Sequence, residues 1–365
     1  ALALLSSIFA QASELDSVRT LNLDPNLVWD KISPNDYVLS KDGRTLVKWK
    51  NHSVSNLDME REPRLSKVQF IGDGAFSSDA YALETVVLAS SVKSIGSHAF
   101  FRCPNLKKML IPISVTSIGN SAFAMCGSLS RLDIPNSVSY IGEGAFFSCG
   151  LKSIVMPSSL KKIEDDTFSY CMSLTSVTIP ASVTSIGNGA FSKNYELEEV
   201  VMPSSVTSIG DYAFDDCYKL AKLAIPKSVT SIGKQAFANC FELSGIELPP
   251  SLTRIEEGTF SSCNKLKSII IPPSVVTIRD RAFSDCQILE SIIIPSSVTS
   301  IGKEAFSSSL SVVLLNLRFE SPKPPYVDDF IASEYSKIKI IVPKGAREAY
   351  IKANLVANAE CIVEE

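Results

Sequence analysis

The sequence predicts a repeat solenoid of the α+β to mostly-β class, and three columns of equivalent residues support this prediction. A Phe recurs in ten intervals, of which eight are 23 residues, one is 24 and one is 22. An Ile column from Ile95 to Ile301 and a Pro column from Pro112 to Pro295 run in step with it. A catalytic site needs to be built only once, so repetition on this scale indicates architecture. The Phe column comprises Phe76, Phe100, Phe123, Phe146, Phe168, Phe191, Phe214, Phe237, Phe260, Phe283 and Phe306.

Each period is interpreted as one coil, as in "LKKMLIPISVTSIGNSAFAMC". Residues 109–111 are expected to form a short strand whose first and third side chains point inward. Pro112 ends that strand, because proline cannot donate to a strand ladder. Residues 115–118 begin a second extended segment, Gly119 turns the chain, and Phe123 places its ring in the core.

A fixed period of 20–29 residues with Leu or Ile at set positions is typical of a leucine-rich-repeat solenoid. We therefore predict about eleven 23-residue coils over residues 65–312, forming a single domain because one coil cannot bury its own apolar face. Residues 13–64 and 313–365 are expected to form N- and C-terminal caps.

Residues 1–12 form an apolar run that ends in an A-x-A-like sequence, which predicts the remnant of a secretory signal peptide. The alternative is a short N-terminal helix packed on the fold.

Composition excludes several other classes of protein. Hydrophobic residues make up 45% of the chain and charged residues 20%, which argues against disorder. The net charge is −4 and no basic stripe is present, so the electrostatic footprint of a nucleic-acid-binding protein is missing. No uninterrupted apolar stretch reaches the length of about 18 residues that a transmembrane helix requires.

Eight of the nine Cys residues lie three positions after a column Phe, and Asn194 fills the one gap in that series. Leucine-rich repeats exchange Cys and Asn at an inward-facing turn, where a small polar group bonds loop backbone. The pattern favours a ladder of buried thiols. Disulfides remain the alternative, and a zinc site is disfavoured because there is no C-x₂-C pair. The eight residues are Cys103, Cys126, Cys149, Cys171, Cys217, Cys240, Cys263 and Cys286.

With these columns in place, the sequence resembles the BspA-type leucine-rich repeats, whose pattern is close to "LxxIxIPxSVxxIGxxAFxxC". The resemblance covers residues 65–312. Residues 37–50, "YVLSKDGRTLVKWK", resemble the hairpin that precedes such arrays. Residues 340–355, "IIVPKGAREAYIKANL", resemble the strand–helix unit that closes them. It implies a bacterial cell-surface or secreted protein, often linked to adhesion or host-protein binding. Its departures are expected to alter only local turn geometry. Glu164, Glu256 and Arg279 replace the turn Gly, and Thr167 and Thr259 replace the Ala before Phe.

No constellation in the sequence predicts an enzyme. His52 and His98 are the only His residues, and no nucleophile elbow, P-loop or dinucleotide fingerprint occurs. Acidic pairs at 165–166, 215–216 and 256–257 fall on separate coils, which indicates solvated turns. Trp29 and Trp49 are expected to cap the first coil. We therefore predict no catalytic residues, no cofactor and no metal site.

A partner of a solenoid usually binds a face formed by one position of successive repeats. The outward middle residue of each strand before Pro defines such a face, here called the strand column, and six of its nine residues are apolar. An exposed apolar surface indicates a protein partner; the alternative is β-propensity with self-packing on a concave face. The strand column comprises Leu110, Asp133, Val155, Thr178, Val201, Ala224, Glu247, Ile270 and Ile293.

A second surface column consists of paired Thr and Ser residues, which would bind or carry glycans or simply keep the strands soluble. The pairs are 116–117, 139–140 (Ser-Tyr), 184–185, 207–208, 230–231 and 299–300. Two hypotheses for function follow. One is a secreted or surface-exposed adhesin that binds an extracellular or host protein through the repeat face. The other is an envelope scaffold without a dedicated ligand, and a glycan-binding module is a weaker third.

Overall fold

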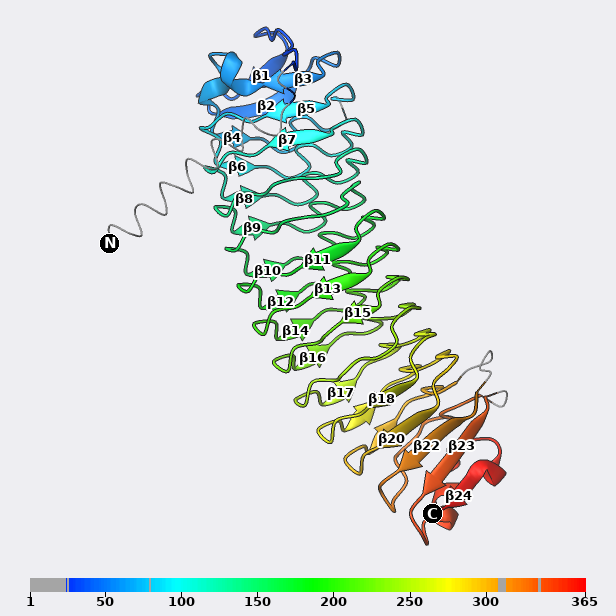
Figure 1. Ribbon diagram of the computed structural model, residues 1–365. Helices are drawn as coiled ribbons and strands as arrows, with labels where there is room; N and C mark the ends of the chain where they lie inside the picture. Colours follow the sequence, from blue (N-terminus) through cyan, green and yellow to red (C-terminus); the bar gives the residue numbers. More distant parts are fainter. Residues whose placement is uncertain (1–23, 25, 79, 308–312, 334–335) are drawn as a thin grey trace, which may run out of the picture.

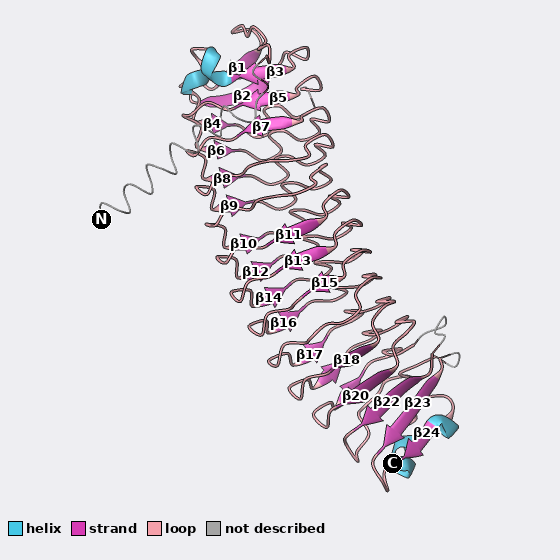
Figure 2. Ribbon diagram, in the orientation of Figure 1, coloured by secondary structure: helices cyan, strands magenta, loops and turns pink. Residues whose placement is uncertain are grey.

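The computed structural model describes residues 24, 26–78, 80–307, 313–333 and 336–365, and these form one elongated solenoid (Figure 1). The solenoid has about fourteen turns and almost no helix, and most of each coil is loop and turn (Figure 2). The predicted repeat solenoid is confirmed. The predicted count of eleven coils is too low, because the flanking segments continue the stack at both ends. The segment 1–12, predicted as a signal-peptide remnant, lies outside the described residues.

Two series of parallel strands run side by side along the solenoid (Figure 1). Series I contains the two-residue strands that end at the Ile column, and equivalent residues of neighbouring coils are paired in register, as in Ser94↔Ser117. Its members are β4 (Phe70–Ile71), β6 (Ser94–Ile95), β8 (Ser117–Ile118), β9 (Tyr140–Ile141), β10 (Lys162–Ile163), β12 (Ser185–Ile186), β14 (Ser208–Ile209), β16 (Ser231–Ile232), β17 (Arg254–Ile255), β19 (Thr277–Ile278) and β21 (Ser300–Ile301).

Series II contains the longer strands, most of which precede the Pro column. In β7 the side chain of Met109 is buried and that of Leu110 is half-buried, as strand alternation predicts. Its members are β3 (Asn56–Asp58), β5 (Thr85–Val87), β7 (Lys108–Leu110), β11 (Ser176–Thr178), β13 (Glu199–Val201), β15 (Lys222–Leu223), β18 (Ser268–Ile270), β20 (Ser291–Ile294), β22 (Leu315–Phe319), β23 (Ile338–Val342) and β24 (Ile362–Glu364).

The flanking segments join these two series directly. In the N-terminal flank, β1 (Tyr37–Leu39) and β2 (Thr45–Trp49) form the predicted antiparallel hairpin, and β2 pairs in parallel with β4. Two 3₁₀ turns, η1 (Met59–Arg61) and η2 (Leu65–Lys67), follow β3. In the C-terminal flank, β22, β23 and β24 extend series II in parallel, with α2 (Arg347–Lys352) and η3 (Ala359–Cys361) between the last two strands. The boundaries between caps and repeats remain predictions.

The core is organised around a continuous stack of Phe rings. All eleven column residues are at most 2% exposed, and successive rings are nearly parallel with centroids 4.6–5.7 Å apart. Trp49 begins the stack, with its ring centroid 5.5 Å from that of Phe76. Such contacts contribute about 0.5–1.5 kcal/mol per pair beyond burial. Trp49 is itself stacked on Tyr37, whereas Trp29 lies beside the Arg61 guanidinium, 5.6 Å from its ring centroid. The expectation that both Trp residues cap the first coil stays a prediction.

The Cys column forms the predicted ladder of buried, free thiols. Each thiol donates to the backbone carbonyl of a column Phe on the preceding coil, as Cys126 Sγ does to Phe100 O at 3.1 Å. Asn194 occupies the position at which the Cys column has a gap, and it makes the equivalent hydrogen bond, because its Nδ2 donates to Phe168 O at 3.0 Å. Burial raises the pKa of the Cys171 and Cys286 thiols to about 12, so these groups stay protonated at neutral pH.

We predict that a thiol reagent will label few sites in the native protein and all nine after denaturation. Cys361 is half-buried and is expected to be the first to react, because the eight column thiols are buried and out of reach of the reagent. Quantitative labelling before and after addition of guanidinium, followed by mass spectrometry, checks this. Disulfides between adjacent coils in the native protein would contradict it.

A second ladder, which the sequence analysis did not predict, explains the recurring Ser-Val and Ser-Leu dipeptides. The Ser hydroxyl donates to the carbonyl of the residue one position later in the preceding coil, as Ser114 Oγ does to Val92 O at 2.6 Å. Eight coils repeat this bond at 2.5–2.8 Å. The donors are Ser91, Ser114, Ser137, Ser159, Ser182, Ser205, Ser228 and Ser274.

The turn Gly lets successive coils approach closely at the end of each series I strand. A Cβ added at Gly119 would lie 2.6 Å from the backbone N of Ser97, so any other residue there requires the neighbouring backbone to shift. The N–H of Gly119 instead donates to Ile95 O at 2.8 Å, and the bond recurs along the series. The equivalent N–H groups of Glu164 and Glu256 make no such bond in the described chain.

Series I is consequently interrupted between β9 and β10 and between β16 and β17. At both interruptions a Glu occupies the turn position of one coil, and the turn position of the preceding coil is a Gly. A Thr three residues after each Glu bonds the backbone of that Glu. Thr167 Oγ1 donates to Glu164 O at 2.8 Å, and Thr259 Oγ1 donates to Glu256 O at 2.9 Å. The expectation that the departures alter only turn geometry was too narrow. Nothing in the structure explains why Arg279, above Glu256, keeps its bond to Ile255 O.

Candidate protein-binding face

The nine residues of the strand column occupy outward positions of series II, between inward side chains that fill the core. Ile270 is 82% exposed and Val155 67%, while Ile293 and Val201 are about half exposed, at 51% and 49%. Asp133, Thr178, Ala224 and Glu247 are exposed, and Leu110 is half-buried. Singly exposed aliphatic side chains are ordinary on a protein surface, so the informative feature is the adjacent pair Ile270 and Ile293.

Strand pairing brings the column residues together in coil order. Val87 pairs with Leu110, Asp133 with Val155, Thr178 with Val201, Glu247 with Ile270, and Ile270 with Ile293. The column continues beyond the predicted nine, because Ile293 pairs with Arg318, Arg318 with Ile341, and Ile341 with Val363. Sequence reasoning missed these three residues, although alternation in "LNLRF" and "IKIIV" carries the signal.

The N-terminal part of the column mixes apolar and polar residues and lies beside a small hollow of about 210 Å³. Leu110 and Asp133 line this hollow together with Lys107, Lys108 and Arg131. Arg131 Nε lies 3.2 Å from Asp133 Oδ1, and both side chains are largely exposed. An exposed pair of this kind adds little stability. These charges therefore remain available to orient a partner.

The C-terminal part of the column is apolar. Ile270 and Ile293 are adjacent, and the other outward positions of their strands, Ser268 and Ser291, are small. Glu247 precedes this pair and Arg318 follows it. The structure therefore places two exposed Ile side chains between an acidic and a basic residue.

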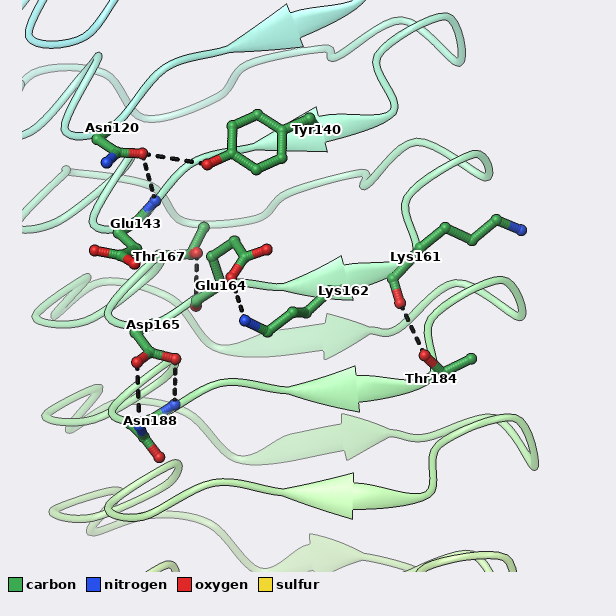
Figure 3. Close-up of polar contacts among 10 residues, drawn as sticks. All are labelled: Asn120, Tyr140, Glu143, Lys161, Lys162, Glu164, Asp165, Thr167, Thr184 and Asn188. Carbon is green, nitrogen blue, oxygen red and sulfur yellow. Dashed lines mark hydrogen bonds and ion pairs between the residues drawn. The ribbon is translucent and has the colours of Figure 1, made fainter.

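The second predicted column lies on series I, where its Thr hydroxyls bond the preceding coil. Thr184 Oγ1 donates to Lys161 O at 3.3 Å (Figure 3), and Thr116, Thr207, Thr230 and Thr299 make equivalent bonds. The Ser residues of three pairs line an open groove of about 680 Å³ over β10, β12, β14 and β16. Because the Thr hydroxyls are engaged between coils, these bonds support the structural interpretation of this column over glycan binding.

An Asp/Asn ladder, also absent from the sequence analysis, runs beside that groove. Asn120 Oδ1 accepts from the backbone N–H of Glu143 at 3.2 Å, and Asp165 Oδ1 from that of Asn188 at 2.9 Å (Figure 3). Asn188 and Asp211 accept in the same way from the next coil. These side chains fill the position after the turn Gly and serve coil stacking.

Three aromatic rings also stack in register along successive coils. The centroids of Tyr195 and Tyr218 are 4.7 Å apart and those of Tyr218 and Phe241 are 4.8 Å apart, with nearly parallel planes. Each inner ring face is covered by the next ring, whereas stacking on a sugar requires an open face. This row therefore does not favour glycan binding.

The acidic pairs lie on separate coils, as predicted, but one of them is not simply solvated. Burial, and then the neighbouring Asp216 carboxylate, raises the pKa of Asp215 to about 6. Asn239 Nδ2 donates to Asp216 Oδ1 at 2.9 Å and lies 3.4 Å from Asp215 Oδ1. The folded chain therefore holds the Asp215 proton more tightly than the unfolded chain does.

We predict that Asp215→Asn will stabilise the protein above pH 6 and have no effect near pH 4. Because the pKa of Asp215 is about 6 in the folded chain, ionising this carboxyl group lowers the stability of the fold at any pH above about 6. The loss of stability disappears as the pH falls toward 3.8, the ordinary pKa of an Asp side chain. The gain at pH 7.5 should be about 1 kcal/mol, since partial exposure screens the charge. Melting temperature against pH checks this. Equal curves for wild type and Asp215→Asn would contradict the prediction.

Among the described residues, no group of three or more His, Cys, Asp or Glu side chains could hold a metal ion. No helix in that part of the chain is long and apolar enough to cross a membrane. His98 packs against Phe101, with ring centroids 5.4 Å apart.

The 23-residue period, the parallel strand series and the Cys/Asn ladder together define a leucine-rich-repeat solenoid. The particular family follows from comparison of the sequence with family models. The model of the BspA type leucine rich repeat region matches residues 69–198 and 185–313, in six copies. The chain belongs to this family, as its resemblance predicts.

Solved structures of bacterial leucine-rich-repeat proteins share the fold. A leucine-rich repeat protein from Bacteroides ovatus is 23% identical, with 87% of this chain and 99% of that chain covered at a TM-score of 0.56. A leucine rich cell surface protein from Faecalibacterium prausnitzii is 25% identical, with coverages of 92% and 94% and a TM-score of 0.53. The pneumococcal vaccine antigen PcpA is 18% identical, with coverages of 90% and 82% and a TM-score of 0.53. No curated protein matches the chain.

Proposed function

We propose that this protein is a non-enzymatic, secreted or surface-exposed binding protein that acts as an adhesin and engages an extracellular protein partner through the strand column. The observation that carries the proposal is the neighbouring pair Ile270 and Ile293, which are 82% and 51% exposed on one sheet. Membership of the BspA type family and the likeness to a bacterial cell surface protein support the location.

The two parts of the column serve different purposes in this proposal. A few fully desolvated residues at the centre of a protein interface contribute most of the affinity, and Ile270 and Ile293 are the expected ones here. Charged residues govern orientation and the rate of association more than they govern affinity. Asp133 and Glu247 are therefore expected to set the register of the partner on the solenoid.

The experiment is a binding screen of the full chain against purified extracellular-matrix and serum proteins by surface plasmon resonance. For any protein that binds saturably, Ile270→Ser together with Ile293→Ser should weaken binding by about 2–4 kcal/mol, or roughly 30-fold to 900-fold in Kd. The matched control changes Thr184 and Thr207 to Ser on series I, and should leave Kd unchanged.

Two outcomes would contradict the proposal. If the outward Ile pair is neutral while the Thr/Ser column or the N-terminal flank is essential, the binding face lies elsewhere. If no tested protein binds, and cells lacking the chain keep their attachment while their envelope is altered, the scaffold alternative is favoured.

A further inference from the structure

The C-terminal two thirds of the strand column has a symmetric order of residue types. Reading coil by coil, it runs Val201, Ala224, Glu247, Ile270, Ile293, Arg318, Ile341 and Val363, and strand pairing links the residues from Glu247 to Val363. The centre lies between the two Ile residues. Each position before the centre corresponds to one of the same type after it, except that the acidic residue corresponds to a basic one.

A surface of this kind is complementary to a second copy of itself turned end for end. A two-fold axis parallel to the strands, passing between Ile270 and Ile293, would place Glu247 of one copy opposite Arg318 of the other. The same rotation places Ile270 opposite Ile293 of the second copy, and Ala224 opposite Ile341. A two-fold interface requires one surface patch to match itself in this way.

We propose that two copies of this chain associate antiparallel through residues 201–363 of the strand column. The inference rests on the proposed function in treating the column as a protein-binding face, and it assigns the C-terminal part of that face to a second copy. A second copy and an extracellular partner would therefore compete for Ile270 and Ile293.

The charges of the two marker residues support this arrangement. Glu247 is exposed and has no ion-pair partner in the described chain. Arg318 pairs with Glu365 through Nη1 at 2.6 Å, yet its side chain remains 52% exposed. A guanidinium carries five N–H donors, so Arg318 can bind a second carboxylate without giving up the first.

The dimensions also suit a dimer. Eight coils at a spacing of about 4.8 Å extend over roughly 34 Å. That length is close to the diameter of the patch of roughly 800 Å² that each partner contributes to a standard interface. At the centre of the patch the small residues Gly245, Ser268 and Ser291 occupy the neighbouring outward column, which leaves room for the Ile side chains of the two copies to meet. Farther out this column is polar, and the rotation would bring position 222 opposite Lys339, so the attraction is expected to come from the strand column.

The test measures the mass of the full chain in solution by sedimentation equilibrium between 1 and 100 µM. The wild type is expected to reach twice the chain mass of 39.5 kDa. Glu247→Arg and Arg318→Glu should each weaken self-association by about 100-fold, because each places like charges opposite one another. Lys161→Glu on series I is the control and should not affect it.

Mixing the variants gives the decisive result. An equimolar mixture of Glu247→Arg with Arg318→Glu should form a heterodimer, since every charge pair is again opposite in sign, and the double variant should form a homodimer. A wild type that stays monomeric at 100 µM would overturn the inference. A dimer that neither variant weakens, or variants that the mixture does not rescue, would also overturn it. A monomer that still binds another protein through Ile270 and Ile293 would leave the proposed function intact.

Discussion

Replacing Ile269 and Ile292 together by Ala is expected to lower the free energy of unfolding by at least about 4 kcal/mol. Both side chains are almost completely buried, at 4% and 1% exposure, in adjacent coils of series II. Truncation removes apolar contacts and leaves cavities that the stacked coils cannot fill, at a cost of about 2–5 kcal/mol per Ile. Urea unfolding followed by far-UV circular dichroism measures the loss.

The matched control is the outward pair, one residue later on the same strands. Changing Ile270 and Ile293 to Ser should alter stability by no more than about 0.5 kcal/mol, as is usual for exposed positions. The two double variants therefore separate folding from binding. If the outward pair destabilised the protein as much as the inward pair, the assignment of the two faces of β18 and β20 would be wrong.

Deleting residues 313–365 is expected to lower the melting temperature by on the order of 10 °C and to cause aggregation. The deletion removes β22, which pairs with β20 along four residues. It also removes the carbonyl of Ile331, which accepts from the N–H of Phe306 at 2.9 Å. The last ring of the Phe stack and an unpaired strand edge would then face water, and such edges promote association between chains.

A deletion of one whole period provides the control for that experiment. Removing residues 208–230 joins Thr207 to Ser231, which preserves the local sequence and both ends of the stack. This variant should stay monodisperse by light scattering, apart from the self-association of the wild type, and melt close to it. A soluble 1–312 chain with unchanged melting would show that the C-terminal flank does not cap the stack.

The repeating part of the fold could be predicted from the sequence because each coil has the same environment as its neighbours. A residue such as Phe123 contacts the equivalent residue above and below it, so the requirement for an aromatic ring is repeated in every period. The same reasoning explains Cys126 and its replacement by Asn at position 194. A residue that recurs at the period of the repeat is therefore one that contacts its equivalents in the neighbouring coils.

The flanks could not be predicted in the same detail, because they lack the Phe, Ile and Pro columns. Arg318 continues the strand column 25 residues after Ile293, which breaks the 23-residue register, although Ile341 follows Arg318 by 23 residues. The number of turns was underestimated for the same reason. The outward positions of β22 and β23 follow from alternation within each strand, but their pairing with the array depends on loops of unequal length.

The interruptions of series I were also beyond sequence reasoning. Glu164 and Glu256 are recognisable in the sequence as departures from the repeat pattern. The pattern does not, however, give the distance between neighbouring coils at this turn. The Cβ contact of 2.6 Å at Gly119 shows that this bend has no spare room. Whether the chain would respond by losing hydrogen bonds or by straining the backbone could be decided only from coordinates.

Those two interruptions have a mechanical consequence. At each one the hydrogen bonds of series I are missing, while the Phe stack continues across with centroid distances of 5.5 Å between Phe146 and Phe168 and 5.7 Å between Phe237 and Phe260. At the first interruption the bridge between Asp133 and Val155 keeps series II continuous, but at the second no strand pairing among the described residues joins β15 to the coil of Glu247. The coils there are held by the ring stack and by backbone bonds of the turn, such as that from Phe237 N–H to Thr259 O at 3.0 Å. A sideways load on a tethered molecule is therefore expected to separate the coils first between Phe237 and Phe260.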